Sequence, residues 1–249
     1  AEETSLTALR IAELAMEAGV PAGVFNVVPG AGPDVGEPLG RHMDVDMISF
    51  TGSTETGRRF LRYASESNLK EVTLEMGGKN PAVVLDDAEN LDRVAAHIVN
   101  GAFWNMGENC SASSRLVVQK GVREDLLKRI FAHVREWPVG DPLDPANRVG
   151  ALVSKAHYDK VCSYLGKGAK VLMGGKAEGG FVEPTVLDVS DRDAAQVREE
   201  IFGPVIAVYG YDDMAEAIER ANALPYAFQA AGFTSRLDTA MRLVNALDA

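Results

Sequence analysis

Cys110 lies in a segment whose residues suit a reactive thiol. It follows the pair Gly107-Glu108 and precedes Ser111-Ala112-Ser113, and these small neighbours leave room for a substrate carbon and for backbone N–H donors. A thiolate is a strong nucleophile when its surroundings stabilise the anion. A lone cysteine in a helix-to-strand turn is also often a buried, inert side chain. The segment therefore predicts either a catalytic nucleophile or a structural cysteine.

Glu75 lies at the end of an apolar segment and is followed closely by Gly77-Gly78. Glycines at such a place allow the backbone to approach a ligand closely. A carboxylate that is partly removed from water accepts a proton more readily and can act as a general base. The alternative is an ordinary surface carboxylate at the edge of a strand, and Glu75 alone does not decide between the two.

A third segment, Phe50-Thr51-Gly52-Ser53-Thr54-Glu55-Thr56-Gly57, joins a predicted strand to a predicted helix. The free N–H groups and the positive dipole end of a helix N-terminus suit phosphate. Gly52 permits a tight turn, and Ser53 can cap the helix or donate to a phosphate oxygen. The segment lacks the usual G-x-G-x-x-G pattern, so a capped helix without a ligand is the alternative. A glycine-rich loop, Gly30 to Gly36, could flank the same nucleotide.

Helical and strand-like patterns alternate along the chain and would position these residues. We expect helices at residues 4–19, 91–104, 123–137, 155–165, 214–223 and 237–247, a short helix towards residue 42, and one ending near residue 65. We expect strands at residues 24–28, 47–50, 71–75, 82–85, 115–119, 169–172, 205–209 and 230–233. Strands separated by helices imply a parallel, doubly wound α/β sheet. A break in the pattern places a domain boundary near Gly77.

The composition limits the classes of protein to which the chain could belong. Its 249 residues suffice for one large domain or two small ones, and the net charge of −11 disfavours nucleic acid or an anionic membrane as the main partner. Cys110 and Cys162 lie too far apart for the disulfide framework of a small secreted domain, and four His with no Cys-x-x-Cys disfavour a structural zinc site. We expect Cys162 to be a small buried side chain. No segment has the roughly 18 apolar residues of a membrane span, and we expect a cytoplasmic protein.

Four segments, taken in order, resemble motifs of the aldehyde dehydrogenase superfamily. They are Phe50-Thr-Gly-Ser-Thr-Glu-Thr-Gly57, Glu75-x-Gly-Gly-Lys-x-Pro81, Gly107-Glu-x-Cys110 and Glu199-Glu-Ile-Phe-Gly-Pro-Val205. The resemblance covers essentially the whole chain. It implies that residues 1–77 are the C-terminal part of a Rossmann-type, doubly wound NAD-binding domain, and that residues 78–249 form a second α/β domain with the catalytic thiol.

The resemblance also implies a mechanism. Cys110 matches the residue that attacks an aldehyde to give a thiohemiacetal, from which hydride leaves to the nicotinamide and a thioester remains. Glu75 matches the base that activates the hydrolytic water, and the backbone N–H of Cys110 would stabilise the oxyanion. The expected product is a carboxylic acid.

Further residues match cofactor contacts of the family. Glu200 matches the carboxylate that binds the nicotinamide ribose, Phe202 packs beside it, and Ser53 matches a pyrophosphate contact. Glu2 falls where the family places a carboxylate near the adenine ribose, which favours NAD over NADP, and a solvated acid ahead of the next helix is the alternative. The other expected cofactor-binding residues are Gly52, Thr56 and Gly57 in the turn and Gly32, Pro33 and Gly36 on the adenine side.

Two departures from the family pattern concern the ends of the chain and one later segment. The oxyanion Asn and the cofactor Lys of the family would lie upstream of Ala1, and the closing motif and the oligomerisation strand would lie downstream of Ala249. We therefore expect the chain to be part of a longer, homo-oligomeric enzyme. Pro225-Tyr226-Ala227-Phe228-Gln229 stands where Tyr-Gly-Leu is common.

The resemblance leaves alternatives for the reaction and the substrate. A CoA-acylating or esterase-like enzyme would use the same thioester, although that branch typically lacks the base that Glu75 provides. A non-enzymatic binding protein or an inactive fragment is a third hypothesis, which the flanking coding sequence would test. Residues 105–115 resemble the branch that acts on γ-glutamylamino- and other ω-amino-aldehydes, whereas residues 225–229 look more like semialdehyde or phosphonoacetaldehyde branches.

Overall fold

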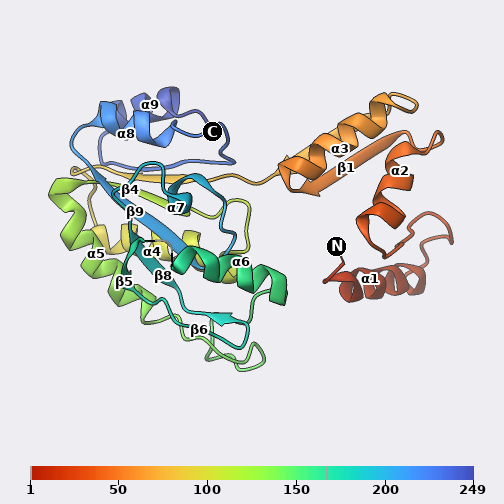
Figure 1. Ribbon diagram of the computed structural model, residues 1–249, viewed down its shortest axis with the longest axis horizontal. Helices are drawn as coiled ribbons and strands as arrows, with labels where there is room; N and C mark the ends of the chain where they lie inside the picture. The colour runs from red at the N-terminus through yellow and green to blue at the C-terminus, as the bar shows by residue number, and fades with distance from the viewer. Residues whose placement is uncertain (1, 167) are drawn as a thin grey trace. The chain divides into compact units, whose positions relative to one another are not determined.

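The computed structural model describes residues 2–166 and 168–249. Its contacts divide the chain into two compact units, a first unit Ala1–Met76 and a second unit Gly77–Ala249. Both units alternate helices with strands (Figure 1), which confirms the α/β class expected from the sequence. The roles expected for the two parts, cofactor binding and catalysis, remain predictions at this point.

The first unit is built around a short parallel sheet. Its elements are α1 (Ser5–Glu17), η1 (Gly32–Gly36), α2 (Glu37–Arg41), β1 (Met47–Gly52), α3 (Thr54–Ser65) and β2 (Glu71–Met76). β1 and β2 pair in parallel, with Met47 opposite Glu71 and Gly52 opposite Met76. α3 connects the two strands and buries Phe60 against them, where its ring lies 4.8 Å from that of Phe50. The predicted strand–helix–strand order is thus confirmed here.

α1 forms for local reasons. Gly19 ends it with a φ of +93°, and the N–H groups of Ala18 and Val20 bond to carbonyls of the last turn, which is a common way for a helix to stop. No residue of α1, all of which the structure describes, is buried, and Leu6 is 80% exposed. The periodic pattern therefore predicted the helix correctly, while the described residues leave its apolar face uncovered.

The strand expected at Val24–Val28 is wrong, because the structure has turns and extended chain there. Val24 is 70% exposed and Val28 is 65% exposed. A strand needs a neighbour that completes its hydrogen bonds. The only strands among residues 2–76 are β1 and β2, and they pair with each other. The apolar run therefore has the composition of a strand, but no described strand pairs with it.

The second unit contains a larger mixed sheet. Its helices are α4 (Leu91–Phe103), η2 (Trp104–Gly107), α5 (Lys120–Val134), α6 (Lys155–Leu165), α7 (Ala195–Arg198), α8 (Met214–Ala221) and α9 (Leu237–Ala246). Its strands are β3 (Pro81–Val84), β4 (Arg115–Gln119), β5 (Lys170–Met173), β6 (Ala177–Glu178), β7 (Phe181–Val182), β8 (Thr185–Asp188), β9 (Val205–Tyr211) and β10 (Ala231–Phe233). The sheet order is β10-β3-β4-β9-β8-β5, and all pairs are parallel except β5 with β8.

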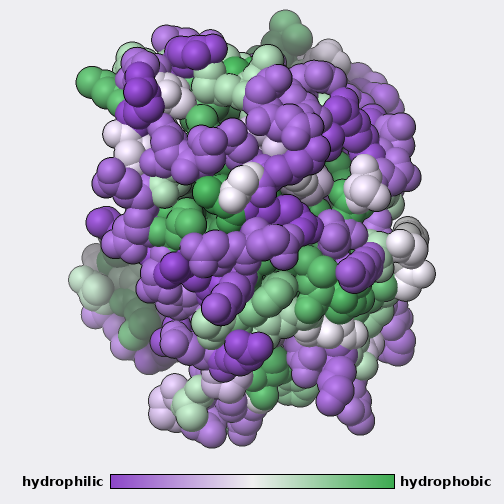
Figure 2. Space-filling model, turned by 90° about the vertical axis from the view of Figure 1, so that its left-hand side faces the viewer, coloured by the Kyte–Doolittle hydropathy of each residue, from purple (hydrophilic) through white to green (hydrophobic). Residues whose placement is uncertain are grey.

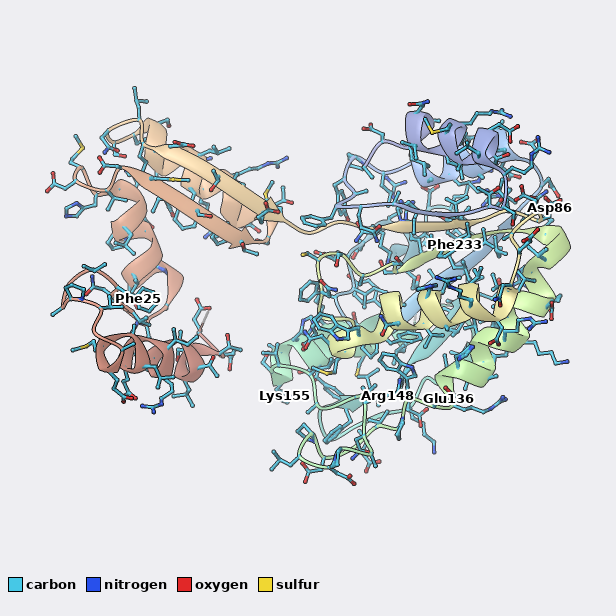
Figure 3. The ribbon with its side chains drawn as sticks, turned by 180° about the vertical axis from the view of Figure 1, so that it is seen from behind. Phe25, Asp86, Glu136, Arg148, Lys155 and Phe233 are labelled. Atoms are coloured by element: carbon cyan, nitrogen blue, oxygen red, sulfur yellow. The ribbon has the colours of Figure 1, made fainter. Side chains whose placement is uncertain are left out.

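Helices cover both faces of this sheet (Figure 1), as in a doubly wound fold. One hydrophobic cluster joins α4 and α5 to alternate strand residues such as Val84, Leu116 and Val118. The other cluster joins α6, α7, α8 and α9 to the intervening residues, such as Val83 and Val117. Because both faces are buried, these strands are continuous apolar runs without alternation. Figure 3 labels Phe233 at the end of β10 and Asp86 just beyond the end of β3, the strand with which β10 pairs.

The sequence missed five elements described in the second unit, namely η2, β6, β7, β8 and α7. β6 and β7 are two-residue strands, too short to give a pattern. β8 is a buried strand between β5 and β9, and its four residues follow Pro184 without flanking alternation. The antiparallel pairing of β5 also departs from the parallel sheet that the sequence predicted, because the hairpin-like excursion through β6 and β7 returns the chain beside β5.

The face drawn in Figure 2 is mostly hydrophilic, with hydrophobic side chains in smaller groups among the polar ones. Within residues 2–166 and 168–249, no helix combines the length and the apolar character that a membrane span requires.

Candidate active site

The turn that carries Cys110 is held in an unusual backbone conformation. After α4 the chain passes through Asn105, Met106 and Gly107, whose φ angles are +52°, +57° and +68°. A Cβ on Gly107 would lie 2.2 Å from the carbonyl oxygen of Gly203, so only glycine fits this close approach. Non-glycine residues in the left-handed region are strained, and such strain persists only where packing enforces it. The turn is thereby fixed directly against the segment that contains Glu200 and Phe202.

The Cys110 loop, residues 109–113, presents its thiol and one backbone donor. Asn109 O accepts from Ala112 N at 3.0 Å, and Asn109 Oδ1 accepts from Ser111 N at 3.2 Å and lies 4.0 Å from Cys110 Sγ. The Cys110 N–H donates to no acceptor in the described part of the chain. Cys110 itself is half-buried. A half-buried thiol beside an unpaired N–H is the arrangement that a nucleophile with an oxyanion donor requires.

Glu200 lies against the two glycines that follow Glu75. Its Oε1 accepts from Gly78 N at 3.1 Å, and a Cβ on Gly77 would lie 2.2 Å from the same oxygen. Burial raises the pKa of Glu200, opposed by the Gly78 N–H and by the charges of Lys160 and Lys79. Gly77 and Gly78 therefore let the backbone approach the Glu200 carboxylate closely, within the second unit.

Phe202 is linked to the Cys110 turn through a histidine. Phe202 has a φ of +59°, and its carbonyl oxygen accepts from His157 Nε2 at 2.6 Å. The carbonyl can only accept, so Nε2 must carry the hydrogen. Glu108 Oε1 lies 3.4 Å from the same nitrogen and accepts from Val153 N at 3.0 Å. These contacts connect the two predicted motifs that the sequence places far apart.

Glu75 lies in the first unit, near the end of β2, where it pairs with Thr51 of β1. Its side chain is exposed. The partial removal from water expected for this carboxylate is therefore not found. Exposed and half-buried residues alternate along β2, and Glu75 is at one of the exposed positions. Exposure leaves the carboxylate accessible to water.

A cavity of about 530 Å³ in the first unit gathers several of the expected cofactor residues. Glu2 Oε1 accepts from Gly32 N at 3.2 Å at its rim. The backbone N–H groups of Glu2 itself and of Gly32 lower the pKa of Glu2, which keeps this carboxylate ionised. The cavity is also lined by Gly30, Pro33, Gly36, Phe50, Thr51, Thr56 and Tyr63. Its size and its aromatic, glycine-rich and acidic lining fit the adenosine part of a dinucleotide.

The turn between β1 and α3 is capped as expected. Ser53 Oγ accepts from Thr56 N at 3.2 Å and donates to Thr56 Oγ1 at 3.1 Å. A Cβ on Gly52 would lie 2.5 Å from the ring of Phe50, and a Cβ on Gly57 would lie 2.7 Å from Met76 Sδ. Gly57 is buried, so packing of α3 on β2 accounts for this glycine. Ser53 Oγ takes the Thr56 N–H, so the preceding N–H groups of α3, those of Thr54 and Glu55, are left to offer to a phosphate.

Sequence reasoning missed the polar residues beneath the Cys110 loop. Asn80, Lys79 and Arg115 are all fully buried, and Gln229 bonds to the loop from beyond α8. Arg115 donates to the carbonyls of Lys79, Arg220 and Ala221. The signal that could have found them is the presence of polar residues at the start of the apolar strand β4 or just before the apolar strands β3 and β10.

Lys79 gives a pH dependence that can be measured. Its Nζ has no hydrogen-bond partner among the described residues, and burial lowers its pKa from 10.5 to about 7, assisted by Arg115. The unfolded chain then binds more protons than the folded one between these two pH values, so stability must rise with pH in that window. We expect the free energy of unfolding to gain up to about 1.4 kcal/mol per pH unit there, and Lys79→Met to remove this gain.

Urea unfolding followed by tryptophan fluorescence tests this, because both tryptophans, Trp104 and Trp137, belong to the second unit. Lys128→Met, at an exposed position of α5, is the control and should keep the wild-type slope. Identical pH slopes for the wild type and Lys79→Met would show that Lys79 is not a buried, discharged amine.

Comparison with known proteins covers the whole chain. The model of the family described as "Aldehyde dehydrogenase family" matches residues 1–249. The chain is 62% identical over 248 residues to the aminoacetaldehyde dehydrogenase of Pseudomonas aeruginosa. The aligned region covers 98% of this chain and 50% of that protein. The chain thus spans about half the length of the curated relatives it matches.

Solved structures show the same likeness. One is the γ-glutamyl-γ-aminobutyraldehyde dehydrogenase from Burkholderia cenocepacia, with a TM-score of 0.96, 45% identity, and 100% of this chain and 52% of that chain covered. Another is an indole-3-acetaldehyde dehydrogenase in complex with NAD+, with a TM-score of 0.97, 43% identity and the same shares covered. Both include the two units described here.

Proposed function

Because the chain belongs to the aldehyde dehydrogenase family, we propose that it carries the nucleophile, the general base and part of the cofactor site of an enzyme that oxidises an aldehyde to a carboxylic acid with NAD. The observation that carries this proposal is the half-buried Cys110 thiol beside an N–H with no acceptor among the described residues. The proposal concerns the full-length protein, meaning this chain together with the remaining part that its relatives have.

In this proposal the Cys110 thiolate attacks the carbonyl carbon of the aldehyde. A C–S bond forms, and the carbonyl oxygen takes up the negative charge, to which the Cys110 N–H donates. The covalent bond holds the reacting carbon in one orientation, which a freely tumbling aldehyde hydrate would lack. NAD supplies the acceptor for the hydride when it is bound. Loss of that hydride converts the thiohemiacetal into a thioester on Cys110.

Glu75 acts in the second half of the reaction. Its carboxylate takes a proton from a water molecule as the water oxygen attacks the thioester carbon. The C–S bond breaks, the carboxylic acid leaves, and the Cys110 thiolate is restored. The place of Glu75 in the motif Glu75-x-Gly-Gly-Lys-x-Pro81, within the family match, supports this role, and its exposed carboxylate can reach water.

The residues that match cofactor contacts of the family would hold NAD. The cavity around Glu2, Gly32 and Pro33 suits the adenosine, and the start of α3 with Ser53 suits the pyrophosphate. Glu200, with Phe202 beside it, would bind the nicotinamide ribose. The indole-3-acetaldehyde dehydrogenase in complex with NAD+ supports this cofactor.

We propose an amino-aldehyde as the substrate class. The identities of 62% to an aminoacetaldehyde dehydrogenase and of 45% to a γ-glutamyl-γ-aminobutyraldehyde dehydrogenase support it. The test compares kcat/KM of the full-length protein for aminoacetaldehyde and for propionaldehyde, which has a similar size and no amine. We expect aminoacetaldehyde to be preferred at least about tenfold. Equal values would contradict the substrate class, and the absence of NADH formation from either would contradict the reaction.

CoA acylation stays the second candidate, and Glu75 disfavours it because water activation would compete with transfer to the thiol of CoA. A cytoplasmic location, a homo-oligomeric full-length enzyme, and the absence of nucleic-acid and membrane partners stay predictions from the sequence.

Glu2 leads to a prediction about cofactor choice. A carboxylate near the adenine ribose accepts hydrogen bonds from the ribose hydroxyls and repels a 2′-phosphate. We expect the full-length enzyme to prefer NAD over NADP, and Glu2→Ser to narrow the gap in kcat/KM by roughly tenfold to a hundredfold, chiefly by improving NADP. The bond from Gly32 N to Glu2 Oε1 supports this, because it holds the carboxylate at the cavity.

The neighbouring acid provides the control for this measurement. Glu3→Ser changes the net charge equally but removes a carboxylate for which no bond to the cavity is found among the described residues. It should leave the NAD-to-NADP ratio unchanged. Equal use of both cofactors by the unmodified enzyme would refute the role given to Glu2.

A further inference from the structure

Asn80 joins the Cys110 loop to a distant segment of the second unit. It is fully buried, and its Nδ2 donates to Cys110 O at 2.8 Å and to Ala112 O at 3.1 Å. Its Oδ1 accepts from Phe228 N at 2.7 Å and from Gln229 N at 3.2 Å. A side-chain amide offers two donor hydrogens and two acceptor lone pairs, so the bonding capacity of Asn80 is used completely.

Gln229 adds a second set of bonds to the same loop. Its Nε2 donates to Ser111 O at 3.0 Å and to Ser113 Oγ at 3.1 Å. Gln229 belongs to the segment Pro225–Gln229, in which this sequence departs from the common Tyr-Gly-Leu pattern. Together, the amides of Asn80 and Gln229 take the carbonyls of three successive loop residues, 110, 111 and 112.

These bonds determine where the chemical groups of Cys110 point. In a trans peptide the C=O of one residue and the N–H of the next lie in one plane and point in opposite directions. Bonds to the carbonyls of residues 110, 111 and 112 therefore fix the next three N–H groups, including that of Ala112. The Cys110 N–H shares its peptide plane with Asn109 O, which accepts from Ala112 N, so the clamp orients the Cys110 N–H through this bond. The Asn109 O to Ala112 N bond closes the same turn from the other side. Stabilisation of an oxyanion depends on donor positions accurate to a fraction of an ångström.

We propose that Asn80 and Gln229 are positioning residues that clamp the Cys110 loop, so that the Cys110 N–H and thiol are set for attack on a carbonyl. The proposal rests on the role proposed above for Cys110. Neither side chain needs to touch the substrate. Gln229, which lies in the segment that departs from the common pattern, supplies two of the four bonds that the clamp makes to the loop.

The first test is Gln229→Met in the full-length protein. Methionine has a similar length and no donor, and the backbone N–H of residue 229 can still bond to Asn80. We expect hydrogen exchange of the amides at residues 111–114 to become roughly tenfold faster, because two bonds to the loop are lost. We also expect kcat to fall roughly tenfold to a hundredfold while KM for NAD stays the same, since a small displacement of a reacting group has this cost.

The second variant is Asn80→Asp. The acceptor for Phe228 N and Gln229 N remains, but an oxygen replaces the donor that faces the Cys110 and Ala112 carbonyls. We expect a larger loss of kcat than for Gln229→Met. Protonation of the new carboxyl restores one donor, so the ratio of variant to wild-type kcat should rise as the pH falls. A residue that only stabilises the fold would not produce this pH profile.

Gln119→Met is the matched control. Gln119 is also half-buried, and its Nε2 donates to Asp86 Oδ2 at 3.0 Å and to Asp212 O at 3.4 Å, at the far end of β4. It should change neither loop exchange nor kcat. The clamp is overturned if Gln229→Met and Asn80→Asp match this control in exchange, or if exchange accelerates while kcat is unchanged. Hydrogen exchange needs no turnover, so it tests the clamp independently of whether the protein oxidises aldehydes.

Discussion

Cys110→Ala is expected to abolish aldehyde oxidation by the full-length protein, with a loss in kcat/KM of roughly 10⁴-fold or more. Without the thiol there is no covalent adduct, and neither a thiohemiacetal nor a thioester can form. NAD should still bind with unchanged affinity, because the expected cofactor contacts are other residues. NADH formation and the Kd for NAD, measured on the same preparation, check both parts.

The second cysteine provides the control for this substitution. Cys162 is also half-buried and free, and it packs against the hydrophobic cluster of α6 and α7. Cys162→Ala should keep near-wild-type kcat/KM. If turnover survived in Cys110→Ala and disappeared in Cys162→Ala, the nucleophile would be Cys162, and the proposal would be wrong.

Glu75→Gln should separate the two halves of the reaction. Glutamine keeps the size of the side chain but cannot take a proton from water, so thioester hydrolysis should slow by roughly 10²- to 10⁴-fold. Acylation of Cys110 should continue. Stopped-flow absorbance should therefore show one burst of NADH per active site, followed by a much slower steady rate.

Glu71→Gln is the matched control on the same strand. Glu71 lies on the same exposed side of β2 as Glu75, and its substitution should leave both phases as in the wild type. Loss of the burst together with the steady rate in Glu75→Gln would mean that Glu75 acts on the Cys110 thiol before acylation, or that it holds the fold.

Much of the second unit was predictable from the sequence, because continuous apolar runs bounded by turns predict buried strands. The strand Arg115–Gln119 and the helix Lys155–Leu165 have the predicted bounds. The strand wrongly predicted at Val24–Val28 shows the limit of this method, since an apolar run does not show which strand, if any, would pair with it. The missed strand Thr185–Asp188 shows the same limit from the other side, because the sheet that buries it is assembled from distant segments.

The candidate site was predictable where its residues form motifs. The order of four motifs indicated the aldehyde dehydrogenase family, and the family match over residues 1–249 confirms it. Gly107 and Gly203 then bring the Cys110 turn to the Glu200 segment. The roles of Asn80, Gln229 and His157 were not predictable, because their hydrogen-bond partners are far away in the sequence and depend on the finished fold. Glu75 was expected to be partly removed from water, and the structure has it exposed.

The candidate nucleophile and the clamp residues differ in their burial and in their hydrogen bonding. For Cys110 the fold supplies an accessible thiol and an unpaired N–H among the described residues. For Asn80 the fold supplies complete hydrogen bonding and full burial. A side-chain amide neither gains nor loses a proton near neutral pH, so the contribution of Asn80 must come through the position of its neighbours.

The most direct test of the central claim, a thioester on Cys110, is acid-quench mass spectrometry of the Glu75→Gln full-length protein with NAD and aminoacetaldehyde. Slow hydrolysis should allow the acyl-enzyme to accumulate, and acid should preserve it. We predict that the peptide containing Cys110 gains the mass of one acyl group, that omission of NAD prevents this gain, and that peptides containing Cys162 remain unchanged. An unmodified Cys110 peptide at a time when the NADH burst is complete would contradict covalent catalysis by Cys110.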